Sequence, residues 1–257
     1  MDNKKIVMLA GKGSSTNILY NALKDEFAIS TVILEEPIKK TEFLKKRIKK
    51  LGLGTVLGQI LFQFIIVKAL NLTSSKRKKE ILEAYHLDDS AIPEGKIIHV
   101  NSVNDDDCLR RLQNEQPGIV IVNGTRIISK KILNSVQTAF INMHVGITPK
   151  YRGVHGGYWA LANNDIENLG VTIHLVDNGI DTGSILYQKN IAPGKADNFV
   201  TYPLLQLAEG IPLMKKALQD IANNSLSFRQ EGRDESKLWY HPTIIQYLYY
   251  RLKKGIK

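Results

Sequence analysis

The sequence predicts an α/β protein with a mainly parallel β-sheet, on two observations. Short apolar runs of strand length alternate with helical patterns through the first half of the chain, as they do in βαβ units. A glycine-containing turn at residues 11–13 follows the first apolar run and precedes a helical pattern, which is the arrangement found in Rossmann-like folds. We therefore expect a Rossmann-like sheet whose ligand site lies at the carboxyl ends of its strands.

The individual elements follow from the hydrophobic period and the turn signals. Strands are expected at residues 5–10, 29–35, 96–100, 118–123, 139–144, 170–177 and 184–191. Helices are expected at residues 16–24, 41–70, 76–85, 105–113, 156–163, 199–223 and 242–254. The long helical region between the second and third strands indicates an insertion at about residues 41–86. We accordingly predict a main domain of residues 1–192 and a helical C-terminal extension of residues 193–257.

The charge of the chain favours anionic small molecules. The formal net charge over 257 residues is +10, which suits ligands such as phosphates. Much of the basic excess gathers in runs at residues 45–50, 76–79 and 251–257. Such runs are usually solvated helix faces or ends, so we expect no nucleic-acid partner.

Cys108 is the only cysteine, which excludes an intramolecular disulfide and a cysteine-based zinc site. The apolar run at residues 6–10 is too short for a secretory signal. Both observations fit a cytoplasmic location, which is the one we expect.

Residues 51–70 have about the length of a membrane span, and basic residues flank them. However, Gln59, Gln63 and Lys68 interrupt the stretch, and its bulky residues recur at helical spacing. We expect a helix docked on the protein or on a partner, not inserted across a membrane; a membrane-surface helix is the alternative. A lid and a homodimer contact are both open roles for it.

The first polar signal is the turn Gly11-Lys12-Gly13-Ser14. Its glycines permit a tight turn, and backbone N–H groups at the start of the next helix can hold an anion. One of the hydroxyl residues at positions 14–16 could cap that helix. The third glycine of a dinucleotide fingerprint is absent, so a plain strand-to-helix turn is the competing interpretation.

Asn142 and His144 end a predicted strand, where residues two apart project to the same face. An amide beside an imidazole suits acyl transfer to an amine, because the amide stabilises the oxyanion and the imidazole manages the proton. An Asn-x-His at a strand end is also a common structural feature. Asp177 or Asp181 could orient the imidazole and raise its pKa, and spacing leaves the choice between them open.

Two segments are similar to the active-site segments of the folate-dependent formyltransferases. They are Asn142-Met143-His144-Val145-Gly146-Ile147-Thr148-Pro149, continuing to Gly153, and Gly170-Val171-Thr172-Ile173-His174, continuing through Ile180-Asp181-Thr182-Gly183. The resemblance covers about residues 5–10 and 97–191. It implies transfer of a formyl group from 10-formyltetrahydrofolate to an amine, with no metal.

The resemblance also implies roles for single residues. By motif position the family's catalytic Asn, His and Asp fall on Asn142, His144 and Asp181, so that Asp181 and not Asp177 partners the imidazole. The resemblance implies that two loops hold the folate. The pterin-binding loop at 123–128 contributes Gly124, Arg126, Ile127 and Ile128, and the loop that closes over the ring contributes Val176, Asp177 and Gly179.

The acceptor amine is expected on a small molecule, a nucleotide-linked amino sugar, with contacts from Gly11 to Ser14, Tyr151 and Arg152. The inserted and C-terminal helices argue against a glycinamide ribonucleotide formyltransferase, although the Gly11 turn resembles that subfamily's phosphate loop. A methionyl-tRNA formyltransferase is disfavoured because its C-terminal barrel needs more chain than follows Ile191. A non-catalytic folate-binding relative is the remaining alternative, and the roles of His155 and His174 stay open.

Overall fold

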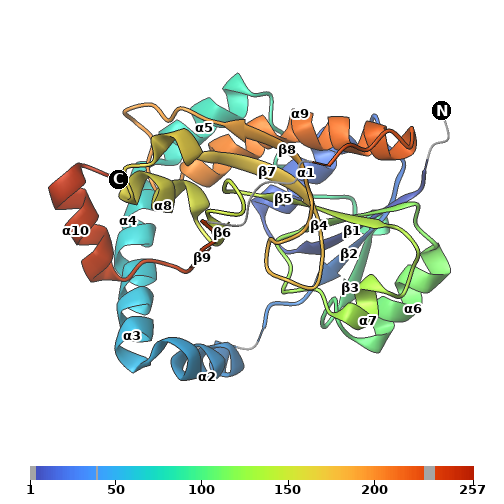
Figure 1. Cartoon of the computed structure of the whole chain (residues 1–257), viewed down its shortest axis with the longest axis horizontal. Helices are drawn as coiled ribbons and strands as arrows, with labels where there is room; N and C mark the ends of the chain where they lie inside the picture. The colour runs from blue at the N-terminus through green and yellow to red at the C-terminus, as the bar shows by residue number, and fades with distance from the viewer. Residues whose placement is uncertain (1–3, 39, 229–234) are drawn as a thin grey trace.

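A seven-stranded sheet forms the centre of the protein (Figure 1). The computed structural model describes residues 4–38, 40–228 and 235–257. Residues 1–3 lie outside the described part, and the expectation that the chain has no secretory leader partly rests on them. The strands are β1 Ile6–Gly11, β2 Ile29–Glu35, β3 Ile97–Val100, β4 Ile119–Asn123, β5 Ala139–His144, β7 Gly170–Leu175 and β8 Ile185–Asn190. Their order is β3-β2-β1-β4-β5-β7-β8; the first five are parallel, and β7 and β8 are antiparallel. The predicted mainly parallel sheet is confirmed.

Different helices cover the two faces of this sheet. Alternate residues of a strand point to opposite faces; in β1, Met8 packs in one apolar cluster, whereas Val7 and Leu9 pack in another. The helices over the first cluster are α1 Ser14–Leu23 and α9 Tyr202–Ala222, and those over the second are α6 Asp106–Glu115 and α7 Lys130–Leu133. Burial on both faces explains why the parallel strands are continuous apolar runs.

Helix α9 belongs to the main hydrophobic core. Its residues Ile211, Met214 and Leu218 pack in the same cluster as Met8 of β1 and Ile173 of β7. The boundary expected at residue 192 therefore falls inside one core, and α9 is a layer of the main fold and not an extension appended to it.

The chain between β2 and β3 is helical, as predicted. Its elements are α2 Lys40–Leu51, α3 Leu53–Leu61, the π-helical turn η1 Phe62–Val67, α4 Lys68–Thr73 and α5 Ser75–Ala84. The stretch Leu53–Thr73, here called the long helix, is the one helix among the described residues that is long and apolar enough to cross a membrane. In Figure 1, α2 and the long helix stand apart from the sheet, beside α10 Ile244–Lys254.

A third apolar cluster joins the long helix to the rest of the fold. Phe62 is 0% exposed, and its ring contacts those of Phe199 and Tyr247 at centroid distances of 4.8 and 5.3 Å. The remaining described elements are α8 Gly156–Ala162, the short 3-10 helices Glu94–Lys96 and Ile166–Asn168, and the strands β6 Arg152–Gly153 and β9 Leu238–Trp239. The β6–β9 pair, which the sequence did not predict, attaches the C-terminal segment to the loop that follows β5.

Candidate active site

The candidate catalytic residues meet where β5 lies beside β7. Cross-strand pairing sets Asn142 opposite His174, and His144 opposite Thr172. Residues that are opposite each other in an antiparallel pair point to the same face. Asn142, His144 and His174 therefore share one face near the carboxyl end of β5, which is the edge where open α/β sheets bind ligands.

His174 links the amide to the carboxylate. Its Nδ1 donates to the carbonyl oxygen of Leu175 at 2.7 Å, which leaves Nε2 as the acceptor of the neutral ring. Asn142 donates to this atom through Nδ2 at 3.1 Å, and a carboxylate oxygen of Asp181 lies 3.6 Å from it. Asn142 is thus hydrogen-bonded to this imidazole atom and Asp181 lies beside it, and the second N–H of the Asn142 amide is left for a ligand.

His144 is held between a carbonyl group and a carboxylate. Its Nε2 donates to the carbonyl oxygen of Tyr151 at 2.7 Å, and its Nδ1 lies 3.4 Å from Asp181 Oδ2. Because Nε2 carries the proton, Nδ1 is the atom that can accept another. Burial lowers the pKa of His144, and the opposing effect of the Asp181 charge is smaller. The carboxylate raises the pKa of this imidazole, as expected, but burial outweighs it and the net pKa lies below the ordinary value.

Asp181, and not Asp177, faces the imidazole. The backbone N–H of Gly153 donates to Asp181 at 2.9 Å, and the main chain of Asp181 takes a positive φ of 51°. Burial favours the neutral acid, but His144, His174 and the Gly153 N–H together lower the pKa of Asp181 to about 2. Asp177 instead accepts hydrogen bonds from Gly179 and Thr182 within its own turn. The choice that spacing left open is thus decided by geometry.

The loop expected to hold the pterin is anchored by a carboxylate that sequence reasoning missed. Glu35, at the end of β2, accepts hydrogen bonds from the backbone N–H and the Nε of Arg126, both at 2.6 Å. It also accepts one from the N–H of Val103 and is 7% exposed. Gly124 turns the loop with a φ of 66°, while the side chain of Ile127 is 58% exposed. The side chain of Arg126 therefore holds the loop on β2 and does not project into a ligand site.

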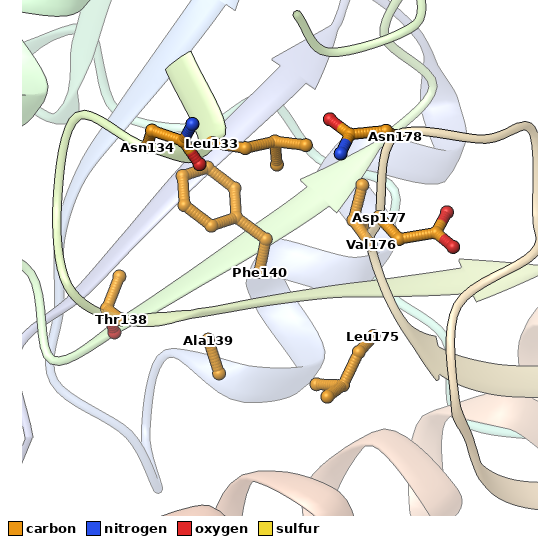
Figure 2. A pocket seen from close by; sticks show the side chains of 9 residues that line it. All are labelled: Leu133, Asn134, Thr138, Ala139, Phe140, Leu175, Val176, Asp177 and Asn178. Carbon is orange, nitrogen blue, oxygen red and sulfur yellow. The ribbon is translucent and has the colours of Figure 1, made fainter. Parts of the chain in front are cut away.

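A cavity of about 280 Å³ lies at the amino end of β5, and none of the catalytic residues lines it. Figure 2 shows Phe140 at its centre, with Leu133 of α7 above the ring and Val176, Asp177 and Asn178 at one side. Phe140 precedes Asn142 by two residues on β5, so both lie on the same face of the strand. The other lining residues from this segment, Thr138 and Ala139, lie on the side of Phe140 away from Asn142. Five residues expected at the folate do not line the cavity: Gly124, Arg126, Ile127, Ile128 and Gly179. Val176 and Asp177, expected at the folate, line it.

The Gly11 to Ser14 turn lies at the carboxyl end of β1. A side chain at Gly11 would meet the carbonyl oxygen of Gly124 at 2.3 Å, so only glycine lets the two loops approach. No side chain caps α1: its N-cap is Gly13, and the hydroxyl of Thr16 turns back to the carbonyl of Gly11. The expected hydroxyl cap is therefore wrong, and the exposed Lys12 stands beside an uncapped helix start.

Tyr151 and Arg152, also expected to contact the substrate, both form hydrogen bonds within the protein. The side chain of Tyr151 is 1% exposed and donates to Asp165 at 2.7 Å, so it faces the core and not a ligand. Arg152 donates through Nη1 to the carbonyl of Ile180 at 3.0 Å, next to Asp181. Its buried Nε has no hydrogen-bond partner among the described residues. Arg152 lies beside the catalytic Asp181 through the Ile180 contact, but its unpaired Nε is buried.

His155 and His174, whose roles were open, differ in position. His174 lies among the catalytic residues, while His155 pairs with His241 at 2.9 Å and packs on Phe199. The sequence marked His174 only as a strand histidine; its role depends on the register of β5 with β7, which no local pattern specifies. Within the described ranges, no group of three or more His, Cys, Asp or Glu side chains could hold a metal ion.

Comparisons with known proteins point to one family. The model of the formyl transferase family matches residues 58–201, which is more than half of the chain. The methionyl-tRNA formyltransferase of Thermodesulfovibrio yellowstonii is 39% identical over 101 residues, which is 38% of this chain and 32% of that protein. That of Finegoldia magna is 31% identical over 146 residues, 55% of this chain and 46% of that protein. The chain thus spans between a third and a half of the length of these curated relatives.

Solved structures share the fold at low identity. A sugar N-formyltransferase from Shewanella sp. has a TM-score of 0.58 at 16% identity, covering 92% of this chain and 76% of its own. Glycinamide ribonucleotide transformylase 1 from Symbiobacterium toebii has a TM-score of 0.57 at 17% identity, covering 93% and 96%. WlaRD, a sugar 3N-formyl transferase solved with dTDP and 5-N-formyl-THF, has a TM-score of 0.53 at 20% identity, covering 93% and 70%.

Proposed function

Because the chain belongs to the formyl transferase family, we propose that it transfers a formyl group from 10-formyltetrahydrofolate to the amine of a small substrate. The observation that carries the proposal is the convergence of Asn142, His144 and Asp181 at one strand edge, with His174 in contact with two of them. An amide donor, a base and a carboxylate are the groups that this acyl transfer requires.

We propose the cavity beside Phe140 as the place of the donor's pterin ring. A pterin is a flat bicyclic ring with hydrogen-bonding edges, and the cavity combines the apolar Leu133, Phe140 and Val176 with the polar Asn134 and Asn178. The formyl-bearing nitrogen is separated from the ring by one methylene group. Successive residues on one face of a strand are about 6.6 Å apart, so a ring over Phe140 brings the formyl group toward Asn142.

The residues divide the reaction between them. The amine attacks the formyl carbon, the carbonyl electrons move onto oxygen, and the free N–H of Asn142 stabilises this oxyanion. The amine proton passes to Nδ1 of His144, with Asp181 or a water as relay, because Nε2 is already bonded to Tyr151. The carbonyl re-forms as the bond to the folate nitrogen breaks; that nitrogen receives the proton and leaves as tetrahydrofolate. Asp181, ionised because its pKa is about 2, stabilises the imidazolium while it exists.

For the acceptor we propose a nucleotide-linked amino sugar. Two of the structural neighbours are sugar N-formyltransferases by their names, and Arg152 contacts the main chain beside Asp181. The net charge does not support this choice, because the basic residues gather on α2, α5 and α10 and not around the candidate site. A cytoplasmic location stays a prediction.

A ribonucleotide amine is the second candidate, and the Gly11 turn favours it. The uncapped start of α1, with the exposed Lys12, offers unpaired backbone N–H groups at the carboxyl end of β1. Such a helix start binds phosphate well. A phosphate held there would place a phosphoribosyl amine along the same sheet edge as Asn142.

The test measures release of tetrahydrofolate by absorbance, with 10-formyltetrahydrofolate at saturation and candidate amines in turn, and confirms each product by its gain of one formyl mass. We expect turnover with a nucleotide-linked amino sugar and none with glycinamide ribonucleotide. The reverse result would assign the second candidate. Binding of the folate without release of tetrahydrofolate, for every amine tested, would refute catalysis and leave a folate-binding protein.

A further inference from the structure

The long helix presents an apolar stripe to solvent. Leu53, Leu57 and Leu61 recur every four residues and are 57, 50 and 48% exposed. Phe64 and Leu72 continue the stripe and are 71 and 72% exposed. Large apolar side chains in a continuous exposed row mark a surface that another body covers.

Helix α10 carries a second stripe. Ile245, Leu248, Tyr249 and Leu252 follow the spacing of one helical face and are 76, 43, 55 and 82% exposed. The opposite face of α10 packs on the long helix through Tyr247, which contacts the ring of Phe62. The two stripes are carried by neighbouring helices, and these helices lie at the side of the molecule away from β1 and β3 (Figure 1).

The buried side of the long helix ties it to the protein along its length. Gln59 donates to the carbonyl of His241 at 2.6 Å, and Gln63 pairs with the ring of the same histidine at 2.9 Å. Phe62 is wholly buried between them. Spanning a bilayer would break these contacts and carry both amides into hydrocarbon, so the helix is built to lie on a surface and not to cross it.

The positive charge of the protein is concentrated in the chain segments that carry these stripes and flank them. Residues 40–79 hold eleven basic residues and one acidic residue, and residues 244–257 hold four basic residues and no acidic one. This excess is larger than the net charge of +10 for the whole chain, so the rest of the chain is net acidic. Among the described residues, Lys49, Lys76 and Lys253 form no ion pair.

We propose that the long helix and α10 form a docking surface that binds the protein to an anionic lipid bilayer. The apolar stripes enter the boundary between headgroups and acyl chains, and the flanking lysines contact the anionic headgroups. Charge complementarity decides between this partner and a second copy of the chain. In a symmetric dimer each copy presents the same surface, so a dimer through this face brings two strongly basic surfaces together.

The test uses the full chain and sedimentation with vesicles of two compositions, phosphatidylcholine alone and phosphatidylcholine with phosphatidylglycerol in equal amounts. We expect binding to the mixed vesicles, weak binding to the neutral ones, and release by high salt, because headgroup contacts are screened. Equal binding to both vesicles, or binding that salt does not release, would overturn the electrostatic part of the proposal and with it the surface-bound arrangement.

Variants on each helix locate the surface. Phe64→Ser and Leu252→Ser should each weaken binding to the mixed vesicles about tenfold, the scale of one buried large apolar side chain. Lys49→Gln and Lys253→Gln should each weaken it about fivefold, as expected for one basic residue at an anionic surface. Ile166→Ser and Lys130→Gln are the matched controls, because both side chains are exposed elsewhere and should leave binding unchanged.

A dimer is the competing outcome. Analytical ultracentrifugation of wild type and Phe64→Ser reports it directly. If wild type is a dimer that Phe64→Ser dissociates, and neither vesicle binds, the surface is an interface between copies and the membrane proposal is wrong. Both serine variants replace exposed side chains, and circular dichroism checks that they fold. Formyl transfer should stay unchanged in both variants. A failure of the membrane proposal can therefore be told apart from a failure of the proposed enzyme activity.

Discussion

Most proteins bury apolar side chains and expose polar ones. The catalytic edge and the long helix both depart from this rule, in opposite ways. At the edge of β5 and β7, polar groups are buried: His144 and His174 are 4 and 2% exposed. On the long helix, apolar groups are exposed: Phe64 and Leu72 are 71 and 72% exposed. Either arrangement costs free energy unless something compensates it.

The compensation differs between the two regions. Each buried ring at the catalytic edge has hydrogen-bond partners inside the chain, at Tyr151, Leu175 and Asn142, and both rings lie close to the carboxylate of Asp181. The exposed stripe of the long helix has no such cover among the described residues. A polar network complete within the fold indicates chemistry, whereas an apolar surface left open indicates assembly with a partner.

The largest expected effects test the catalytic edge. Asn142→Ala, His144→Ala and Asp181→Ala should each reduce kcat by about 100-fold or more, the scale of losing an oxyanion donor or a general base. Steady-state release of tetrahydrofolate measures the effect. Vesicle binding by the same variants should match wild type. A variant with near-normal kcat would remove that residue from its assigned role.

Two phenylalanines in one turn sharpen the contrast within the long helix. Phe62 is 0% exposed and Phe64 is 71% exposed. Phe62→Ala should lower the free energy of unfolding by about 3–5 kcal/mol, because it empties a packed site. Phe64→Ala should change it by less than about 0.5 kcal/mol. Urea denaturation compares the two, and equal losses would mean that the outer face is also packed.

The elements of the sheet were predictable because each one has a local signature. The limits of β2 and β5 agree with the sequence prediction at both ends, since their apolar runs are bounded by charged or turn residues. The β6–β9 pair was missed because two-residue strands carry no period. The helices after residue 192 were predicted, but the core that α9 joins was not, because an apolar helix face does not specify its partner.

At the candidate site, the position of the motifs predicted Asn142, His144 and Asp181. It did not predict the residues that contact them or that anchor the neighbouring loop. His174 and Glu35 act through partners far along the chain, at Asn142 and Arg126. Such pairings depend on strand register and loop approach, which local sequence does not specify. For the pKa of His144, the raising effect of the carboxylate was predicted correctly, but the larger lowering effect of burial was not, because burial is a property of the fold.

A smaller effect tests the anchoring of the pterin loop. Arg126→Ala removes the partner of Glu35, whose side chain is 7% exposed. A buried carboxylate without its cation should cost about 2 kcal/mol of stability, discounted from a fully buried pair because Arg126 is 24% exposed. Thermal unfolding measures the loss. The double variant with Glu35→Gln should recover part of it, and no recovery would mean that the arginine acts through packing alone.

The smallest expected effect is a displacement of the pH dependence of kcat. A general base works only when unprotonated, so kcat rises with pH through the pKa of His144. Burial lowers that pKa below the ordinary value of 6.5, despite the opposing charge of Asp181. The midpoint of the acid limb should therefore lie below pH 6.5, and kcat should be level by neutral pH. Asp181→Asn removes the charge that raises the pKa, so the midpoint of its residual activity should move to still lower pH. Single-turnover rates measured across the acid range decide the sign. If the wild-type midpoint lies above pH 6.5 and falls in Asp181→Asn, the carboxylate outweighs burial. The catalytic edge is then more hydrated than its packing indicates.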